Sequence, residues 1–383
     1  MQGASSWPQY NLTPLVAASV EFSLPVVAVG INYRTNVYGF LHVPGQPTNR
    51  GLRDQRTALA WIRANITGFG GDPENITLVG QSAGAAAIAF HTDAGVPGVK
   101  RAVMMSGDPG IMPAFPERTH AATLKKACDA LSVPPGQIVG YLQSAPQSEL
   151  YDRLPEDLMY RPVTPLPSGS GDKLTALMVG NTSDDGGIIA SFSIGPASEG
   201  LAEKLCSYFS ILPESFGQLY NLRPTLSPLE ARSRLVDILT DWGFAVSAVA
   251  AARESKVPTY LYHFTRENPW PASPTNPWAG QANHILDVAH LLGNYPQLEG
   301  NSAVGAAMRK AVLTFAAGRE PWEKYAENKQ VAVFGDGEGS GKRVTVTGED
   351  DRRERAAGWW KVVDEAGGLE KVRGAVMGVL RTL

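Results

Sequence analysis

The stretch that decides the fold is ITLVGQSAGAAAIAF, residues 76–90. Its first residues are apolar or β-branched, which favours a strand, and its alanine-rich second half favours a helix. Between them lies a Gly-x-Ser-x-Gly sequence, Gly80 to Gly84, at a tight strand-to-helix turn. Such a turn strains the backbone of its serine and leaves the side chain standing alone at the end of a sheet. This context predicts Ser82 as a nucleophile, the alternative being an ordinary structural turn.

Strand and helix patterns alternate on either side of this stretch. Residues 25–33, 76–79 and 101–105 are rich in β-branched and apolar residues, and helical spacing occupies 52–66 and 83–90. Further strands are expected at residues 176–179, 259–264, 331–334 and 344–346. The alternation is typical of an α/β fold whose mostly parallel central sheet is covered by helices on both faces.

The remaining segments favour excursions from one large domain, residues 1–383. Lids or pocket walls are expected at about 110–172, which is rich in proline and serine, and at about 190–283. Within the second, Ser227-Pro228-Leu229-Glu230 is a capping box that should open a helix through about Thr240, with Gly243 as its breaker. Four prolines in residues 266–283 predict a long surface or cleft-lining loop.

Composition narrows the classes of function. The 383 residues are 43% hydrophobic, and 34 Lys and Arg against 37 Asp and Glu give a net charge of −3 without blocks of like charge. That balance argues against nucleic-acid partners and favours a small-molecule substrate. Apolar runs such as 83–90 fall short of the ~20 residues that cross a bilayer, so no transmembrane segment is expected. The two cysteines, Cys128 and Cys206, predict neither a metal site nor a disulfide framework.

A serine nucleophile needs a histidine to take its proton and a carboxylate to orient that histidine. Of the six histidines, surface or core positions are expected for four: His42, His91, His120 and His263. His290 would lie within a helix over 285–292, whereas His284 lies in the loop before it, where catalytic groups concentrate. Residues 178–187 end a strand in a polar loop that offers two carboxylates, Asp184 and Asp185. The order Ser82, Asp185, His284 is the chain order of α/β-hydrolase triads.

Together these residues resemble the type B carboxylesterase/lipase family, fungal members in particular. The resemblance is carried, in chain order, by Ile31-Asn32-Tyr33-Arg34 with Gly39-Phe40-Leu41, Gly51-Leu52-Arg53-Asp54-Gln55, Trp61-Ile62, Phe69-Gly70-Gly71-Asp72-Pro73-Glu74-Asn75-Ile76-Thr77, Ser106-Gly107, Ser183-Asp184-Asp185-Gly186, His284-Ile285-Leu286-Asp287 with Gly293, Phe334-Gly335-Asp336 and residues 352–360. It implies an α/β-hydrolase fold that attacks carboxylic esters or lipids through an acyl-enzyme.

The resemblance also implies the roles of the site residues. Ser82 would attack, His284 would shuttle the proton, and Asp185, in place of Asp184, would orient His284. Gln81, where most members of the family carry glutamate, and Ser106 would lie behind these groups. No metal or organic cofactor is implied.

Three departures from the family pattern shape the expectations. No His-Gly-Gly segment occurs in the sequence, which leaves the Ala83 N–H as the sole oxyanion donor and predicts impaired activity. Alignment to the family would place that segment before Gly3, so we expect Met1 to be an internal position and the first strands of the sheet to be missing. The family's disulfide partner for Cys128 is replaced near Gly140, so a buried free thiol is expected there.

Two functions of different classes remain open at this point. The first is a serine carboxylesterase or lipase, and the alternative is a catalytically silent esterase-like binding module. Residues 1–6 do not resemble a secretory signal, while four acceptor sequons, at Asn11, Asn65, Asn75 and Asn181, would permit secretion. The ester, the oligomeric state and the compartment are not readable from the sequence.

Overall fold

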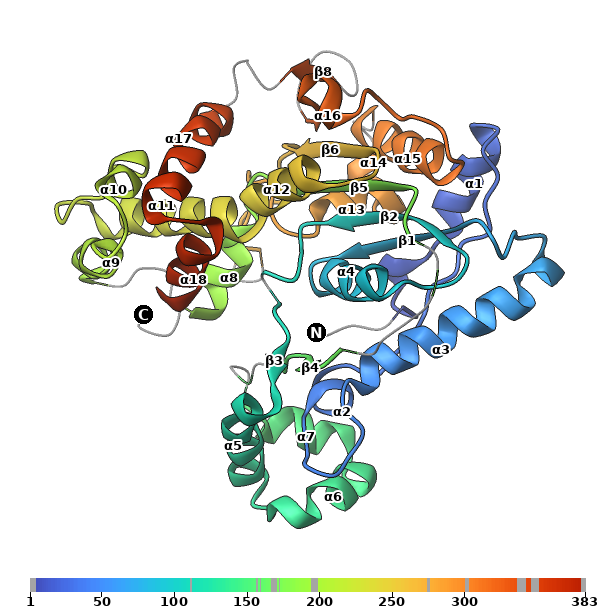
Figure 1. Ribbon diagram of the computed structural model, residues 1–383, viewed down its shortest axis with the longest axis horizontal. Helices are drawn as coiled ribbons and strands as arrows, with labels where there is room; N and C mark the ends of the chain where they lie inside the picture. The colour runs from blue at the N-terminus through green and yellow to red at the C-terminus, as the bar shows by residue number, and fades with distance from the viewer. Residues whose placement is uncertain are drawn as a thin grey trace.

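A twisted central sheet runs through the computed structural model of the chain (Figure 1). The structure describes residues 5–110, 112–155, 158, 160–166, 171, 173–193, 199–273, 276–299, 303–335, 342–345 and 351–379. The six-stranded sheet has the order β1-β2-β5-β6-β7-β8, parallel throughout except for the antiparallel β8. Its strands are β1 Ile76–Gln81, β2 Val99–Met105, β5 Ala176–Thr182, β6 Thr259–Phe264, β7 Gln330–Phe334 and β8 Lys342–Thr345, and β3 Phe115–Pro116 pairs separately with β4 Val163–Thr164. The expected mostly parallel sheet is confirmed.

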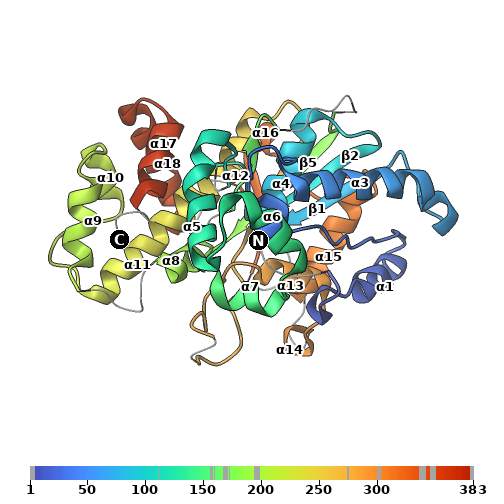
Figure 2. The same ribbon diagram turned by 90° about the horizontal axis from the view of Figure 1, so that it is seen from below.

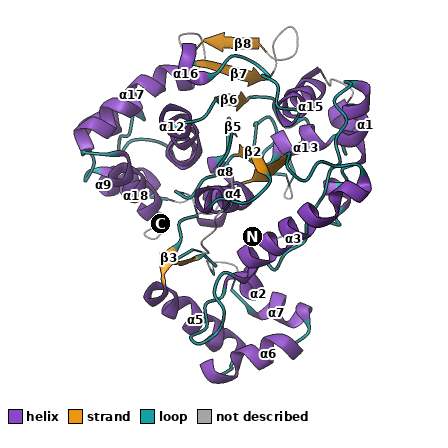
Figure 3. Cartoon of the chain, turned by 45° about the vertical axis from the view of Figure 1, so that its right-hand side comes forward, coloured by secondary structure: helices purple, strands orange, loops and turns teal. Residues whose placement is uncertain are grey.

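Helices occupy most of the sequence between the strands (Figure 3). They are α1 Thr13–Glu21, α2 Asn36–Phe40, α3 Arg50–Asn65, α4 Ala83–Ala94, α5 Ala121–Leu131, α6 Ile138–Ser144, α7 Gln147–Arg153, α8 Gly186–Ser193, α9 Leu201–Phe209, α10 Glu214–Leu219, α11 Pro228–Thr240, α12 Val246–Glu254, α13 Leu286–Leu292, α14 Pro296–Glu299, α15 Ala303–Ala316, α16 Tyr325–Asn328, α17 Asp351–Ala366 and α18 Leu369–Val379.

The two faces of the sheet are buried by different helices, as period-two alternation in buried strands requires. In β2, Ala102 and Met104 pack with α4 and α12 in one apolar cluster. Val103 and Met105 point to the other face and pack with α13 and α15. The expectation of helices on both faces is therefore confirmed, and the core lies in two layers on either side of the strands.

Two further groups of helices lie away from the sheet. Helices α5, α6 and α7 pack with α2 around their own apolar cluster, which forms a lobe below the sheet (Figures 1 and 2). Helices α8 to α11, α17 and α18 share a second cluster centred on the fully buried Trp242. Helices α5 to α7 lie within the range 110–172, and α9 to α11 lie within the range 190–283, whereas α2, α17 and α18 join these groups from other parts of the chain. Strand β6 lies inside the second range, so the helical part of that excursion ends with α12.

One buried carboxylate connects the second group of helices. Asp241 Oδ2 accepts hydrogen bonds from Tyr220 Oη at 3.0 Å, Arg355 Nε at 3.0 Å and Trp359 Nε1 at 3.2 Å. Three donors on one oxygen stabilise a charge that would otherwise be costly in an apolar interior. They join α10 and α17 to the end of α11.

The helix that begins at the capping box is longer than expected. Ser227 caps the N–H of Glu230, and the Glu230 side chain accepts from the Ser227 N–H, which confirms the predicted start at Pro228. The expected break at Gly243 is wrong. Residues Asp241–Ala245 form a π-turn in which Val246 N bonds to Asp241 O, and α12 continues the helix from there. A glycine in a helix costs only ~1 kcal/mol, which burial of Trp242 and Phe244 outweighs.

This continuous helix, Pro228–Glu254, is the only described one long and apolar enough to cross a membrane. Its mean hydropathy is 1.5 over the most apolar 18-residue window, and 78% of that window is buried inside the structure. Such burial is typical of a core helix in a globular protein. The short apolar runs of the sequence did not predict this long helix, because polar residues interrupt the apolar residues along it.

The prediction of a strand at residues 25–33 is wrong. These residues belong to no described strand, and the sheet begins at β1, to which no described strand other than β2 pairs. Val27 and Val29 are 43% and 45% exposed. β-branched residues favour an extended backbone, but a strand exists only where a neighbour supplies hydrogen bonds. The predicted strands at 76–79, 101–105, 176–179, 259–264 and 331–334 are confirmed, and the described part of 344–346 lies in β8, while Val346 lies outside the described residues.

The predicted helices before and after Ser82 are confirmed as α3 and α4, and His91 links them. The His91 ring contacts Gln55 Oε1 through Nε2 at 2.7 Å and accepts from Arg56 Nε through Nδ1 at 3.3 Å. Burial, followed by the positive charge of Arg56, lowers the pKa of His91 from 6.5 to about 4. The folded protein therefore keeps this imidazole neutral where the unfolded chain protonates it.

We expect His91 to make the protein acid-sensitive. Between pH 6.5 and 4 the unfolded state binds the extra proton, so the free energy of unfolding falls as the pH drops through this window, by up to about 3 kcal/mol from this group. The variant His91→Asn should show a shallower pH dependence in urea unfolding at pH 4, 5, 6 and 7. Equal slopes for the variant and the wild type would contradict the role given to His91.

Candidate active site

Ser82 stands at the strand-to-helix turn between β1 and α4, as the sequence predicts. Its backbone has φ 55° and ψ −119°, a conformation that a non-glycine residue adopts only when its surroundings enforce it. The Ser82 N–H donates to Met105 O at 2.8 Å, which fixes the turn to the end of β2. Glycines supply the room: a Cβ at Gly107 would lie 2.2 Å from Ser82 O, and a Cβ at Gly80 would lie 2.7 Å from the Gly84 carbonyl.

The sheet order brings four loops to one edge. Strands β1, β2, β5 and β6 are consecutive neighbours and parallel, so their carboxyl ends point the same way. Ser82 follows β1, Ser106 follows β2, Asp185 lies three residues after β5, and His284 ends the long loop that follows β6. Residues spread over half of the chain are thereby gathered at the usual ligand-binding edge of an α/β sheet.

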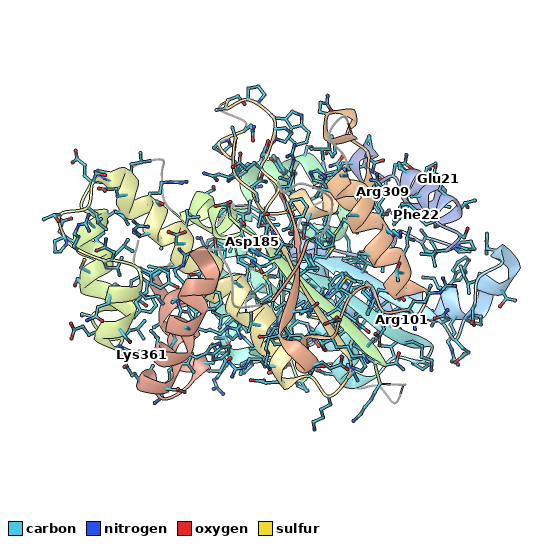
Figure 4. All side chains as sticks on the ribbon, turned by 90° about the horizontal axis from the view of Figure 1, so that it is seen from above. Glu21, Phe22, Arg101, Asp185, Arg309 and Lys361 are labelled. Atoms are coloured by element: carbon cyan, nitrogen blue, oxygen red, sulfur yellow. The ribbon has the colours of Figure 1, made fainter. Side chains whose placement is uncertain are left out.

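Asp185 and His284 are in direct contact. The Nδ1–H of His284 donates to Asp185 Oδ1 at 2.6 Å, and Asp185 Oδ2 accepts the Thr182 N–H at 2.8 Å. The carboxylate is fully buried, and Asp185 is labelled near the middle of the view in Figure 4. The neighbouring Asp184 faces a different partner, because its Oδ2 accepts from Ala282 N at 3.0 Å. Of the two carboxylates in this loop, the structure therefore brings Asp185 to the imidazole.

The other ring nitrogen of His284 faces a glutamine. Gln81 Nε2 lies 2.8 Å from His284 Nε2. Within the described part of the chain, no hydrogen bond joins the hydroxyl of Ser82 to His284 or to any other group. The structure thus brings Asp185 and His284 into direct contact. Ser82, the third predicted residue, follows Gln81 in the chain, and it is Gln81 that contacts Nε2 of the imidazole.

The structure adds Phe244 to the surroundings of His284. Its ring centroid lies 5.3 Å from that of the imidazole, and it comes from the π-turn after α11. The sequence does not predict this residue, because no pattern marks a π-turn that changes the direction of one side chain within a long helix. Phe244 is therefore an apolar neighbour of the imidazole.

A second buried carboxyl lies near the first. Asp287, fully buried in α13, accepts from Tyr262 Oη at 2.7 Å. Burial, reinforced by the negative charge of Asp185, raises the pKa of Asp287 to about 6. Burial likewise raises the pKa of the Tyr262 hydroxyl well above its ordinary value. This pair places a second buried carboxyl in the electrostatic environment of Asp185 and His284.

The remaining predicted site residues have defined positions. Ala83 is the first residue of α4, so its N–H is one of the helix donors without an intrahelical acceptor. Ser106 is fully buried with φ 45°, and its N–H donates to Gly180 O at 2.8 Å. Its hydroxyl has no partner among the described residues. Both residues lie at the carboxyl edge of the sheet beside the turn of Ser82.

Other titratable groups lie away from this edge or within the core. His290 is inside α13, as expected, and burial lowers its pKa to about 4. Both cysteines are free, and Cys128 is buried, as expected. No group of three or more His, Cys, Asp or Glu side chains suited to a metal is found within the residues that the structure describes.

Comparison with known proteins shows which families and folds this chain is similar to. A family model described as the carboxylesterase family matches residues 1–335. The para-nitrobenzyl esterase of Bacillus subtilis is 26% identical over 92% of this chain and 76% of its own length. Human bile salt-activated lipase is 29% identical over 70% of this chain and 41% of its own length. The solved structure of a Geobacillus stearothermophilus carboxylesterase superposes with a TM-score of 0.71 at 25% identity, covering 93% of this chain and 79% of that one.

The close approach of Gly107 to the Ser82 carbonyl gives a testable consequence. Gly107→Ala should lower the free energy of unfolding by about 1–3 kcal/mol, because its Cβ must displace backbone. Gly140→Ala is the matched control: it lies in helix α6 with nothing within 4 Å of its Cβ, and we expect it to be stabilising by about 0.5–1 kcal/mol. Urea unfolding of both variants checks the pair, and equal stabilities would contradict the packing described.

Proposed function

The chain belongs to the carboxylesterase family, and we propose that it cleaves carboxylic esters through an acyl-enzyme on Ser82. The observation that carries this proposal is the buried hydrogen bond between His284 Nδ1 and Asp185 Oδ1, 2.6 Å long. A surface or structural histidine has no need of a fully buried carboxylate on one nitrogen while the other nitrogen contacts Gln81, the residue that precedes Ser82. The sequence relatives named above are themselves esterases and lipases by name.

The proposed reaction follows from the chemistry of these groups. Ser82 Oγ attacks the ester carbonyl carbon while its proton passes to Nε2 of His284. The tetrahedral intermediate then collapses, the C–O bond to the alcohol breaks, and the alcohol leaves with the proton from His284. Water repeats the sequence on the acyl-serine and releases the acid. Asp185 holds the Nδ1–H of His284 and stabilises the imidazolium formed in each half-reaction.

The proposed site has few hydrogen-bond donors for the oxyanion of each intermediate. The Ala83 N–H, at the start of α4, is positioned by the helix to donate to it. The sequence holds no His-Gly-Gly segment to supply further donors. Loss of one such donor costs about 10²–10³ in rate, so we propose that this chain is a slow esterase.

The substrate is proposed to be an uncharged ester or a lipid. Phe244 offers an apolar surface beside His284. Gln81 carries no charge next to the nucleophile, so nothing at that position attracts a cationic alcohol. The acyl and alcohol groups are left open by these contacts.

A second candidate function is an esterase-like binding module that does not catalyse. One observation favours it: the sequence lacks the glycine-rich donor segment. Retention of Ser82, Asp185 and His284 favours the esterase, because a binding module has no physical need for all three.

Covalent labelling distinguishes the two functions. A fluorophosphonate should add once per chain to the wild type, slowly, and should not add to Ser82→Ala, because only an activated serine reacts. Intact-mass spectrometry measures the adduct, and Ser210→Ala, a serine on the exposed end of α9, should label like the wild type. Absence of an adduct on the wild type would favour the binding module.

The acid is tested by two neighbouring substitutions. Asp185→Asn should slow labelling by about 10³–10⁴, because the amide can hold the wrong tautomer of His284 and cannot stabilise its positive charge. Asp184→Asn keeps an oxygen acceptor for Ala282 N and should change the rate less than about tenfold, a difference within about 1.4 kcal/mol. The measurement is the rate of fluorophosphonate labelling of the two variants. An equal loss of rate in both would contradict the role proposed for Asp185.

A further inference from the structure

The proton-accepting nitrogen of His284 is already occupied. Gln81 Nε2 lies 2.8 Å from His284 Nε2, while the Ser82 hydroxyl, on the next residue, makes no hydrogen bond among the described residues. Gln81 is the last residue of β1 and is held there by the register Gln81↔Met105 with β2. The contact is therefore made by a side chain on a rigid element.

The chemistry of the ring decides which group can sit at this position. Because Nδ1 donates its proton to the Asp185 carboxylate, Nε2 of the neutral ring carries a lone pair and accepts. An amide N–H can donate to that lone pair, whereas the amide oxygen could not bond to it. The geometry thus matches a neutral imidazole with its proton on Nδ1.

The same lone pair is the one that Ser82 needs. A single nitrogen lone pair lies in the plane of the ring and accepts one well-aligned hydrogen bond. The Gln81 amide and the Ser82 hydroxyl therefore exclude each other at Nε2. An attack by Ser82 requires the amide to leave first.

We propose that Gln81 is a positioning residue that holds His284 in a resting arrangement and competes with Ser82 for its proton-accepting nitrogen. This inference rests on the proposed esterase function. Among the described residues, the charged and titratable groups near His284 include Asp185 on the loop after β5, Asp184 beside it, and Asp287 with its partner Tyr262. Of these contacts, the Gln81 amide N–H is the one that can bond only to an unprotonated Nε2.

Two substitutions at Gln81 should act in different ways on acid titration. Gln81→Ala removes the donor, so the titration midpoint of His284 should rise by a few tenths of a pH unit. Gln81→Glu places a carboxylate where the amide was, which accepts from protonated Nε2, and the midpoint should rise by about one unit, a tenfold change in the proton equilibrium. If Gln81 had only a structural role, the titration midpoints would not rise in the order wild type, Gln81→Ala, Gln81→Glu.

The two substitutions should also change the rate of fluorophosphonate labelling in opposite directions. At a pH above the midpoint, Gln81→Ala should label with a fluorophosphonate about 3–10-fold faster than the wild type, because the loss of one hydrogen bond frees Nε2 for Ser82. Gln81→Glu should label more slowly than the wild type at neutral pH, because the imidazolium has no lone pair to accept the serine proton.

The experiment combines a spectroscopic and a chemical readout. The full chain, labelled with ¹⁵N-histidine, is titrated by long-range ¹H–¹⁵N NMR, with the His284 signals assigned by their loss in His284→Asn. Labelling rates are measured on the same wild-type, Gln81→Ala and Gln81→Glu proteins. Gln46→Ala is the control, because Gln46 lies in an exposed turn that is distant from Gln81 in the sequence. This variant should match the wild type in both the titration midpoint and the labelling rate.

The outcomes separate this inference from the proposed function. A wild type that labels at Ser82, with midpoints and rates unchanged in both Gln81 variants, overturns the inference alone. Midpoints that move as expected while no protein labels support the contact of Gln81 with His284 and overturn the esterase. Movement of the midpoints together with opposite changes in rate supports both.

Discussion

The structure depends on one buried interaction, the hydrogen bond from His284 to the Asp185 carboxylate. A fully buried carboxylate is costly unless hydrogen bonds surround it, and here the backbone N–H of Thr182 and the imidazole provide them. Both partners lie beyond the carboxyl ends of adjacent parallel strands, β5 and β6. The long loop after β6 must return to this edge for the bond to form, so the pair fixes the path of that loop.

Close packing of the backbone around Ser82 is the second constraint. The carbonyl of Ser82 lies so near Gly107 that no side chain fits there, and the Ser82 N–H bonds to the end of β2. These contacts hold a serine in a backbone conformation that it would not choose alone. The loop after β2 is in turn joined to α18, because Arg373 Nη2 contacts both oxygens of Asp108 at 2.8 and 3.0 Å. The nucleophile turn is thus supported from the carboxyl-terminal helices as well as from the sheet.

Between these two rigid parts, the contact of Gln81 with His284 is the adjustable one. Asp185 fixes one nitrogen of the imidazole, and the sheet fixes the position of Ser82. In the resting arrangement proposed above, the Gln81 side chain has to leave the ring before Ser82 can bond to Nε2. Phe244 and the Asp287–Tyr262 pair lie in the surroundings of the same imidazole.

Local sequence pattern by itself determined the turn from β1 through Ser82 to α4, the capping box of α11, and the strands β2, β5, β6 and β7. It also gave the chain order of Ser82, Asp185 and His284. Periodicity, turn glycines and caps act over a few neighbouring residues, so they can be read without knowledge of the tertiary structure. The resemblance to the family had already selected Asp185 over Asp184 as the partner of His284. Only the tertiary structure decided that residues 25–33 pair with no described strand, that Gly243 lies within a continuous helix, and that Gln81 rather than Ser82 bonds to Nε2. Each of these depends on which distant segment arrives beside a residue, and short-range preferences carry no information about that.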